Sequence, residues 1–170
     1  MRVITAPEDF NLQPNEISVF LAGGIQKTAE WQDEVIAALQ KEFADKSLVV
    51  MNPRRKNFPI HDPNAAFGQI KWEYDALEIA DIFSMYFAGN TTSDQPICML
   101  EYGKHLERRN SNNDLGRLIV SSEPTYSRNQ DVIIQTGLVS KDIHVGKSLE
   151  EHIKMLISIV RMNLISEKLI

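Results

Sequence analysis

The sequence predicts an α/β fold in which a five-stranded parallel sheet carries helices on both faces. Five short apolar runs alternate with longer amphipathic segments along the 170 residues. Strict alternation of strand and helix requires crossover connections, which produce parallel strands covered on both faces. A chain of this length with 43% hydrophobic residues suits one domain with a full core.

The first half of the chain contains two predicted strands and the helix between them. Residues 17–23 are apolar and end in a Gly23-Gly24 loop, and residues 31–43 follow with apolar side chains at close to helical spacing. The second strand covers residues 48–51 and stops at Asn52-Pro53. A polar connection rich in proline comes next.

The middle of the chain repeats this pattern. Apolar residues at helical intervals predict a helix over residues 67–77, and the apolar run 82–88 predicts the third strand. A helix is expected over residues 96–109, with Asp94 as its cap and Pro96 in its first turn.

The last third completes the sheet. Residues 118–121 predict the fourth strand, residues 127–138 a helix, and residues 142–145 a short fifth strand. Residues 148–168 predict a long C-terminal amphipathic helix. Right-handed crossovers between five such strands favour the flavodoxin-like (Rossmann-like) strand order 2-1-3-4-5.

Nothing in the sequence suggests a second domain, so residues 1–170 are expected to form one. Residues 1–16 are polar and rich in turn-forming residues, and we expect them to pack as an N-terminal arm rather than as a core element.

Composition excludes several classes of function. The net charge of −5 and the pI of about 5.4 argue against nucleic-acid binding. A single cysteine fits a reducing compartment, and no apolar run approaches the ~20 residues that span a bilayer. The N-terminus lacks the pattern of a secretory signal. We therefore expect a cytoplasmic protein with no membrane contact.

The predicted ligand site lies where the strands end, because open α/β sheets bind ligands at their carboxyl ends. Glu101 follows the third strand and occupies an otherwise apolar helical turn. Charged groups are seldom placed there without a partner or a task, which makes Glu101 the leading candidate for a reactive residue.

Two neighbours on the same helix leave the role of Glu101 open. Cys98, Glu101 and His105 share one face by their spacing. Glu101 is either a carboxylate nucleophile or half of a surface pair with His105, worth a few tenths of a kcal/mol. Cys98 has no adjacent base, so a small buried residue is favoured over a nucleophile.

Other strand ends carry further candidates, each with a simpler structural alternative. Gly23 and Gly24 would let a ligand approach backbone N–H donors, or form a tight turn. Arg54 and Arg55 would clamp a phosphate or carboxylate, or form an exposed basic turn. Asn52 ends the second strand beside them.

A second acidic residue lies on the preceding helix. Gln69 and Glu73 are four residues apart and either point toward the strand ends or form a solvated face. The four histidines are scattered, so we expect no metal. Neither a dinucleotide fingerprint nor a Walker loop is present, and no cofactor is expected.

Taken in order, these motifs resemble the nucleoside 2-deoxyribosyltransferase-like family over residues 17 to 122. The motifs are Phe20-Leu-Ala-Gly-Gly-Ile25, Trp31-Gln32, Asn52-Pro-Arg-Arg55, Gln69-Ile-Lys-Trp-Glu73, Ala80-Asp81 and Pro96-Ile-Cys-Met-Leu-Glu-Tyr-Gly103. The Asn-Pro-Arg-Arg turn resembles one branch of the family more than the lactobacillus-type transferases.

The resemblance implies cleavage or transfer of the N-glycosidic bond of nucleosides or nucleotides. Glu101 matches the family's nucleophile, and Glu73 stands where an acidic residue contacts the nucleobase. The loop with Gly23, Gly24 and Ile25 matches the wall of the sugar pocket, while Asp81 is expected to be structural.

Departures from the family pattern also bear on the site. Gln95 stands at the spacing of a family aspartate, with Asp94 one residue away, and Cys98 replaces a threonine-like hydroxyl. Family members complete the site with a residue of a neighbouring subunit, often an asparagine after the fourth strand. Asn129 is the candidate here, and a homo-oligomer is expected.

Two alternatives remain at this point. The same fold without turnover would make a nucleotide-binding sensor. A receiver-like signalling module would need paired acidic residues after the first strand, where this chain has Gly23-Gly24.

Overall fold

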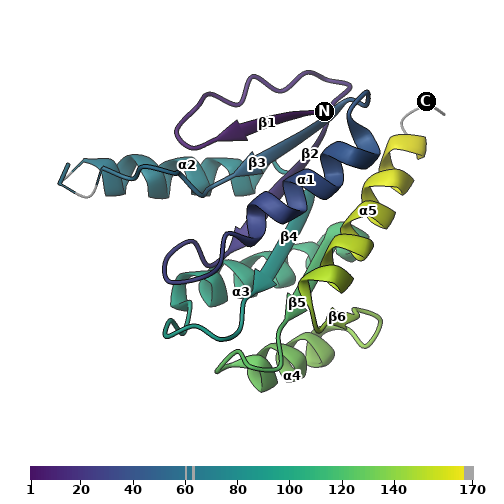
Figure 1. Ribbon diagram of the computed structural model, residues 1–170. Helices are drawn as coiled ribbons and strands as arrows, with labels where there is room; N and C mark the ends of the chain where they lie inside the picture. The colour runs from purple at the N-terminus through teal and green to yellow at the C-terminus, as the bar shows by residue number, and fades with distance from the viewer. Residues whose placement is uncertain (60, 63, 167–170) are drawn as a thin grey trace.

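The fold is a single parallel sheet between two helical layers, described by a computed structural model for residues 1–59, 61–62 and 64–166 (Figure 1). The strands are β1 (Arg2–Thr5), β2 (Ile17–Gly23), β3 (Leu48–Asn52), β4 (Ile82–Phe87), β5 (Leu118–Ser122) and β6 (Val145–Gly146). The helices are α1 (Trp31–Phe43), α2 (Ala65–Ile79), α3 (Pro96–Ser111), α4 (Asn129–Val139) and α5 (Leu149–Ser166), with a short 3-10 turn at Leu115–Arg117.

The strand order is β1-β3-β2-β4-β5-β6, and every neighbouring pair is parallel. Without β1, this is the predicted order 2-1-3-4-5, so the topology is confirmed. The predicted α1 boundaries agree with the structure, and the other helices differ by a few residues at their ends. The last two residues of the predicted C-terminal helix, 167 and 168, lie outside the described residues.

The expectation of five strands and an N-terminal arm was wrong in one respect. Arg2–Thr5 forms a sixth strand, which pairs with β3 from Arg2 opposite Val49 to Thr5 opposite Asn52. Ile4 is buried against the core, while Val3 and Thr5 keep partial exposure. A short edge strand needs few apolar residues, and polar, turn-forming residues follow this one directly. The sequence pattern therefore did not indicate a strand.

Two apolar cores lie on opposite faces of the sheet. On one face, α1 and α5 pack through residues such as Trp31, Val35 and Val160. On the other face, α2, α3 and α4 pack through residues such as Trp72 and Tyr102 (Figure 1). Because both faces are covered, the central strands are buried along their whole length, and the carboxyl ends of the strands are left for loops.

Candidate functional site

Glu101 and Glu73 lie on the same face of the sheet, on α3 and α2 respectively. Both carboxyl groups are partly buried. Burial raises the pKa of Glu101 to about 8, and the negative charge of Glu73 adds to this effect, while Lys104 opposes it. Burial also raises the pKa of Glu73. The two groups are therefore close enough to titrate as a coupled pair.

Gln69 fixes the position of Glu73. Its side-chain amide donates hydrogen bonds to Glu73 Oε1 and to the carbonyl oxygen of Pro53, both at 2.7 Å. Pro53 follows β3, so this contact attaches α2 to the end of that strand. Within the described part of the chain, Glu101 has no hydrogen bond or ion pair, and its carboxyl group remains available for a ligand.

His105 does not form a surface pair with Glu101, and Cys98 is not an activated nucleophile. The His105 ring is buried and stacks on Phe83 with 4.9 Å between the ring centroids. Cys98 is also buried, and burial with the charges of Glu101 and Glu73 raises the pKa of its thiol to about 12. A thiol with this pKa is protonated at neutral pH and is a poor nucleophile.

The two glycines after β2 are required by close contacts. A Cβ atom on Gly23 would lie 2.3 Å from the carbonyl oxygen of Tyr86 and 2.6 Å from Trp31 Cζ2, and φ is +149°. A Cβ atom on Gly24 would lie 2.7 Å from Gln95 Oε1 and from Thr28 Cγ2. The backbone of β2 can therefore approach β4 and α3 only without side chains at these positions.

The carbonyl oxygen of Gly24 accepts hydrogen bonds from several parts of the chain. It accepts hydrogen bonds from Thr28 Oγ1 at 2.7 Å, Trp31 Nε1 at 3.1 Å and Arg54 Nη2 at 3.2 Å. Arg54 Nη2 also contacts Thr28 Oγ1 and the carbonyl oxygen of Ala29. The Arg54 side chain, considered from the sequence as an anion clamp, thus closes the loop between β2 and α1.

Gln95 is the main positioning residue that the sequence analysis did not assign. Its buried side chain accepts the Gly24 N–H at 3.1 Å and donates to the carbonyl oxygen of Ala88 at 2.9 Å. One amide therefore joins the ends of β2 and β4 directly before α3. The backbone N–H of Gly24, one of the two donors considered for a ligand, is occupied by this contact. No sequence signal besides a polar residue before Pro96 marks this role.

The prediction that Asp94 caps α3 was wrong. The cap position belongs to Gln95, in a left-handed conformation, and no side chain forms a capping hydrogen bond. Asp94 instead accepts hydrogen bonds from Ser127 Oγ through its carboxylate and from the Tyr126 hydroxyl through its backbone. These contacts join the loop before α3 to the loop after β5.

The remaining predicted residues surround this region. Buried Asn52 ends β3 and accepts the Arg54 N–H through Oδ1, whereas Ile25 is partly exposed in the loop after β2. The Arg55 guanidinium lies 5.3 Å from the centroid of the Phe58 ring. Asn129 begins α4, and its buried Oδ1 has no hydrogen-bond partner among the described residues.

Glu123 is a further residue that sequence reasoning missed. It follows β5 and accepts hydrogen bonds from the Tyr86 hydroxyl and from the N–H of Gly89, the latter at 2.7 Å. Burial and the Glu123 carboxylate raise the pKa of Tyr86 far above its usual value. Glu123 thus holds the loop after β4 in place.

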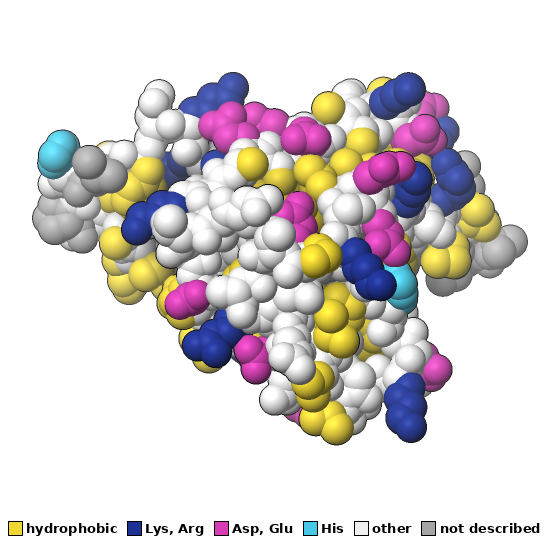
Figure 2. Space-filling model, turned by 60° about the horizontal axis from the view of Figure 1, so that its bottom comes forward, with side chains coloured by type: hydrophobic (Ala, Val, Ile, Leu, Met, Phe, Trp, Pro, Cys, Tyr) yellow, Lys and Arg dark blue, Asp and Glu magenta, His cyan; other side chains and the backbone are white. Residues whose placement is uncertain are grey.

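The structure brings the candidate residues into two groups. Glu73, Gln69, Glu101 and Cys98 form an acidic group, and Gly24, Arg54 and Gln95 form a framework joined by hydrogen bonds. Figure 2 turns the lower side of Figure 1 forward and shows exposed apolar side chains between charged ones of both signs. Nothing joins Asn129 to the acidic group by a hydrogen bond in the described part of the chain.

The described residues lack a membrane-spanning helix and a cluster of metal ligands. No helix there is both long and apolar enough to cross a membrane. No group of three or more His, Cys, Asp and Glu side chains is arranged to hold a metal ion in the same part of the chain.

Comparison with known proteins identifies the family. The family model described as "Nucleoside 2-deoxyribosyltransferase like" matches residues 16–112, more than half of the chain, including both Glu73 and Glu101. No curated protein matches the chain. The branch with the Asn-Pro-Arg-Arg turn stays a prediction. The chain belongs to the nucleoside 2-deoxyribosyltransferase-like family.

Proposed function

We propose that this protein cleaves or transfers the N-glycosidic bond of (deoxy)nucleosides or nucleotides, with Glu101 as the nucleophile. The observation that carries the proposal is the pair of half-buried carboxyl groups, Glu101 and Glu73, on one face of the sheet and within the residues that the family model matches. Glu101 has no hydrogen-bond partner among the described residues, whereas Gln69 orients Glu73.

In the proposed first step, a Glu101 carboxylate oxygen attacks the anomeric carbon. The bond between this carbon and the base nitrogen breaks, and its electrons leave with the base. The transition state resembles an oxocarbenium ion, whose positive charge a nearby carboxylate stabilises. Water or a second base then attacks the same carbon and releases Glu101.

The leaving base needs a proton, and Glu73 is our candidate for its source. Raised pKa values on both carboxyl groups favour a state in which the pair retains a proton near neutral pH. In the free protein this proton lies on Glu101, whose pKa of about 8 is raised by burial and by the negative charge of Glu73. The proposed step therefore requires its transfer from Glu101 to Glu73, which leaves a carboxylate nucleophile and an acid for the departing base.

The basic turn after β3 supports a preference for an anionic substrate. Arg54 is engaged with the β2–α1 loop, which leaves the partly exposed Arg55 as the cation better able to reach a 5′-phosphate. Equal turnover of a nucleoside and its 5′-monophosphate would argue against this preference.

Base release from a panel of nucleosides and nucleotides, separated by chromatography, tests the proposal. We expect release by the wild type and a loss of about a thousandfold or more in Glu101→Ala. Adding a second base distinguishes transfer from hydrolysis. If Glu101→Ala releases base as fast as the wild type does, Glu101 is not the nucleophile.

A sensor that binds a nucleotide without turnover is the second candidate. It is favoured by Gln95, which stands where family transferases carry an aspartate and whose amide is engaged with two backbone groups. Tight nucleotide binding without base release in the same panel would support the sensor over the enzyme.

We also propose that the protein acts as a cytoplasmic homo-oligomer. Apolar side chains are exposed on two neighbouring helices, including Phe67 and Ile70 on α2 and Ile97 and Leu100 on α3. Covering such surface is a common reason for association. Light scattering after size exclusion would contradict this part of the proposal if it gave the mass of one chain.

A further inference from the structure

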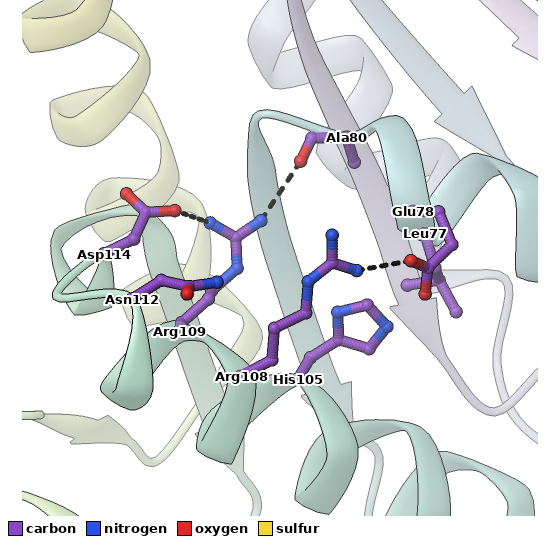
Figure 3. A pocket seen from close by; sticks show the side chains of 8 residues that line it. All are labelled: Leu77, Glu78, Ala80, His105, Arg108, Arg109, Asn112 and Asp114. Atoms are coloured by element: carbon purple, nitrogen blue, oxygen red, sulfur yellow. Dashed lines mark hydrogen bonds and ion pairs between the residues drawn. The ribbon is translucent and has the colours of Figure 1, made fainter.

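A cavity lies at the opposite end of α3 from Pro96 (Figure 3). It has a volume of about 120 Å³. It lies between the C-terminal parts of α2 and α3 and is lined by Leu77, Glu78, Ala80, His105, Arg108, Arg109, Asn112 and Asp114. The carboxyl groups proposed for catalysis do not line it.

Two deeply buried side chains beside this cavity have polar atoms without partners. His105 is 2% exposed and Arg109 is 6% exposed, and the unpartnered atoms are His105 Nε2 and Arg109 Nε. They are four residues apart and therefore lie on adjacent turns of one face of α3. Arg109 Nε can only donate, and His105 Nε2 donates in one neutral tautomer.

Several acceptors around the cavity are already engaged. Both carboxylate oxygens of Glu78 accept hydrogen bonds at 2.6 Å, Oε1 from Lys104 and Oε2 from Arg108. Arg109 donates to Asp114 at 2.6 Å and to the carbonyl oxygen of Ala80 at 3.1 Å, as Figure 3 shows. The two buried nitrogen atoms without partners therefore lack an acceptor rather than a donor.

Among the side chains that line the cavity, two cations balance two anions, and the wider network of ion pairs around it is slightly positive. Four cationic side chains and three anionic ones are connected by ion pairs here, which leaves an excess of one positive charge on a protein whose net charge is −5. The cations are Lys104, Arg108, Arg109 and Arg117, and the anions are Glu78, Asp81 and Asp114.

We propose that this cavity binds a small oxyanion of the phosphate or sulfate class. Arg108, Arg109 and His105 would supply the donors, with guanidinium groups suited to paired oxygens. The volume is several times the roughly 10–15 Å³ that one water molecule needs on the same measure, which accommodates a five-atom oxyanion with its remaining hydration.

Titration calorimetry of the full chain with inorganic phosphate, at ionic strength held constant with sodium chloride, tests this site. We expect one saturable site per chain, weakened about tenfold or more by Arg108→Ala, which removes a charged donor. His105→Phe keeps a ring that can stack on Phe83, removes the Nε2 donor and should also weaken binding. Circular dichroism verifies that both variants are folded.

Two control variants separate this site from other causes of phosphate binding. Arg161→Ala removes an equally charged, exposed side chain paired with Glu42 elsewhere on the molecule and should leave affinity within about twofold. Arg55→Ala removes the cation proposed to hold a substrate phosphate. If only Arg55→Ala weakens binding, phosphate occupies that site instead and the present inference is wrong.

Two further outcomes of the calorimetry identify the ligand or exclude the site. Methyl phosphate that binds as tightly as inorganic phosphate identifies the end of a phosphate monoester as a ligand, whereas selectivity for the inorganic ion identifies the free anion. Absence of saturable heat, or equal affinity in wild type, Arg108→Ala and His105→Phe, would mean that the cavity holds water only.

Discussion

At the scale of single residues, burial determines the protonation of Glu101. The folded-state pKa of about 8 lies above the ~4.3 of an exposed glutamate, so the folded protein holds a proton that the unfolded chain has released between these pH values. The stability contributed by this proton is present below about pH 4 and is lost as pH rises through 8.

Glu101→Gln should therefore become more stable relative to the wild type as pH rises. We expect the difference in free energy of unfolding to grow by about 2 kcal/mol from pH 5 to pH 8.5, allowing for the partial exposure of the carboxyl group. Denaturant unfolding at both pH values measures it, with Glu107→Gln on the exposed face of α3 as the control. Parallel pH profiles for wild type and Glu101→Gln would refute the assignment.

The buried amide of Gln95 gives a second prediction at this scale. Gln95→Leu leaves the Gly24 N–H and the Ala88 carbonyl oxygen without partners and should cost about 2–3 kcal/mol of stability. Gln130→Leu, at an exposed position of α4, should change stability by less than about 0.5 kcal/mol. Similar melting temperatures for the two variants would show that Gln95 does not join β2 to β4.

At the scale of elements, the end of β2 depends on glycine. Gly23→Ala would place a Cβ atom 2.3 Å from the backbone of β4 and should cost about 3 kcal/mol or more. Gly137→Ala, in α4, meets no atom within 4 Å and should stabilise the protein by about 0.5–1 kcal/mol. Chemical denaturation of both variants measures the contrast, and a tolerated Gly23→Ala would contradict the proposed close contact.

The elements also show what could be read from sequence and what could not. Helical spacing gave α1 correctly because its apolar residues, such as Trp31 and Val35, face one core. Periodicity missed β1, where four residues at the sheet edge carry too little pattern to stand out. The hydrogen bond from Arg54 to the Gly24 carbonyl oxygen could not be predicted either, because it joins residues 30 positions apart that meet only in the folded chain.

At the scale of the whole molecule, alternation of strands and helices was enough to predict the topology. The carboxyl-end rule leads to Glu101, whose role stays a prediction. The framework that supports the site was not predictable in this way. Gln95 and Glu123 act through contacts with backbone groups, and such contacts leave no signature of spacing or composition.

Opposing titrations predict a stability maximum near neutral pH. Burial lowers the pKa of His105 to about 4 and that of His152 to about 3, so the stability that their neutral forms contribute is present above about pH 6.5 and is lost as pH falls toward these values. Glu101 acts in the opposite direction between about pH 4 and pH 8, and its effect dominates above about pH 6.5, where the histidines no longer titrate.

We therefore expect the highest melting temperature at about pH 6–7 in the wild type, with the maximum of Glu101→Gln at higher pH. Thermal unfolding from pH 4.5 to pH 9 measures both curves. A wild-type maximum above pH 8 would be incompatible with the raised pKa of Glu101.

The most direct test of the central claim is to trap the sugar on Glu101. A 2-fluoro sugar analogue of a nucleoside whose base is released should slow turnover, because fluorine destabilises the oxocarbenium-like transition state. The account predicts that mass spectrometry finds one added sugar per chain, on the peptide that contains Glu101, and none in Glu101→Ala. Base release with the sugar attached to another residue, or equal labelling of Glu101→Ala, would contradict it.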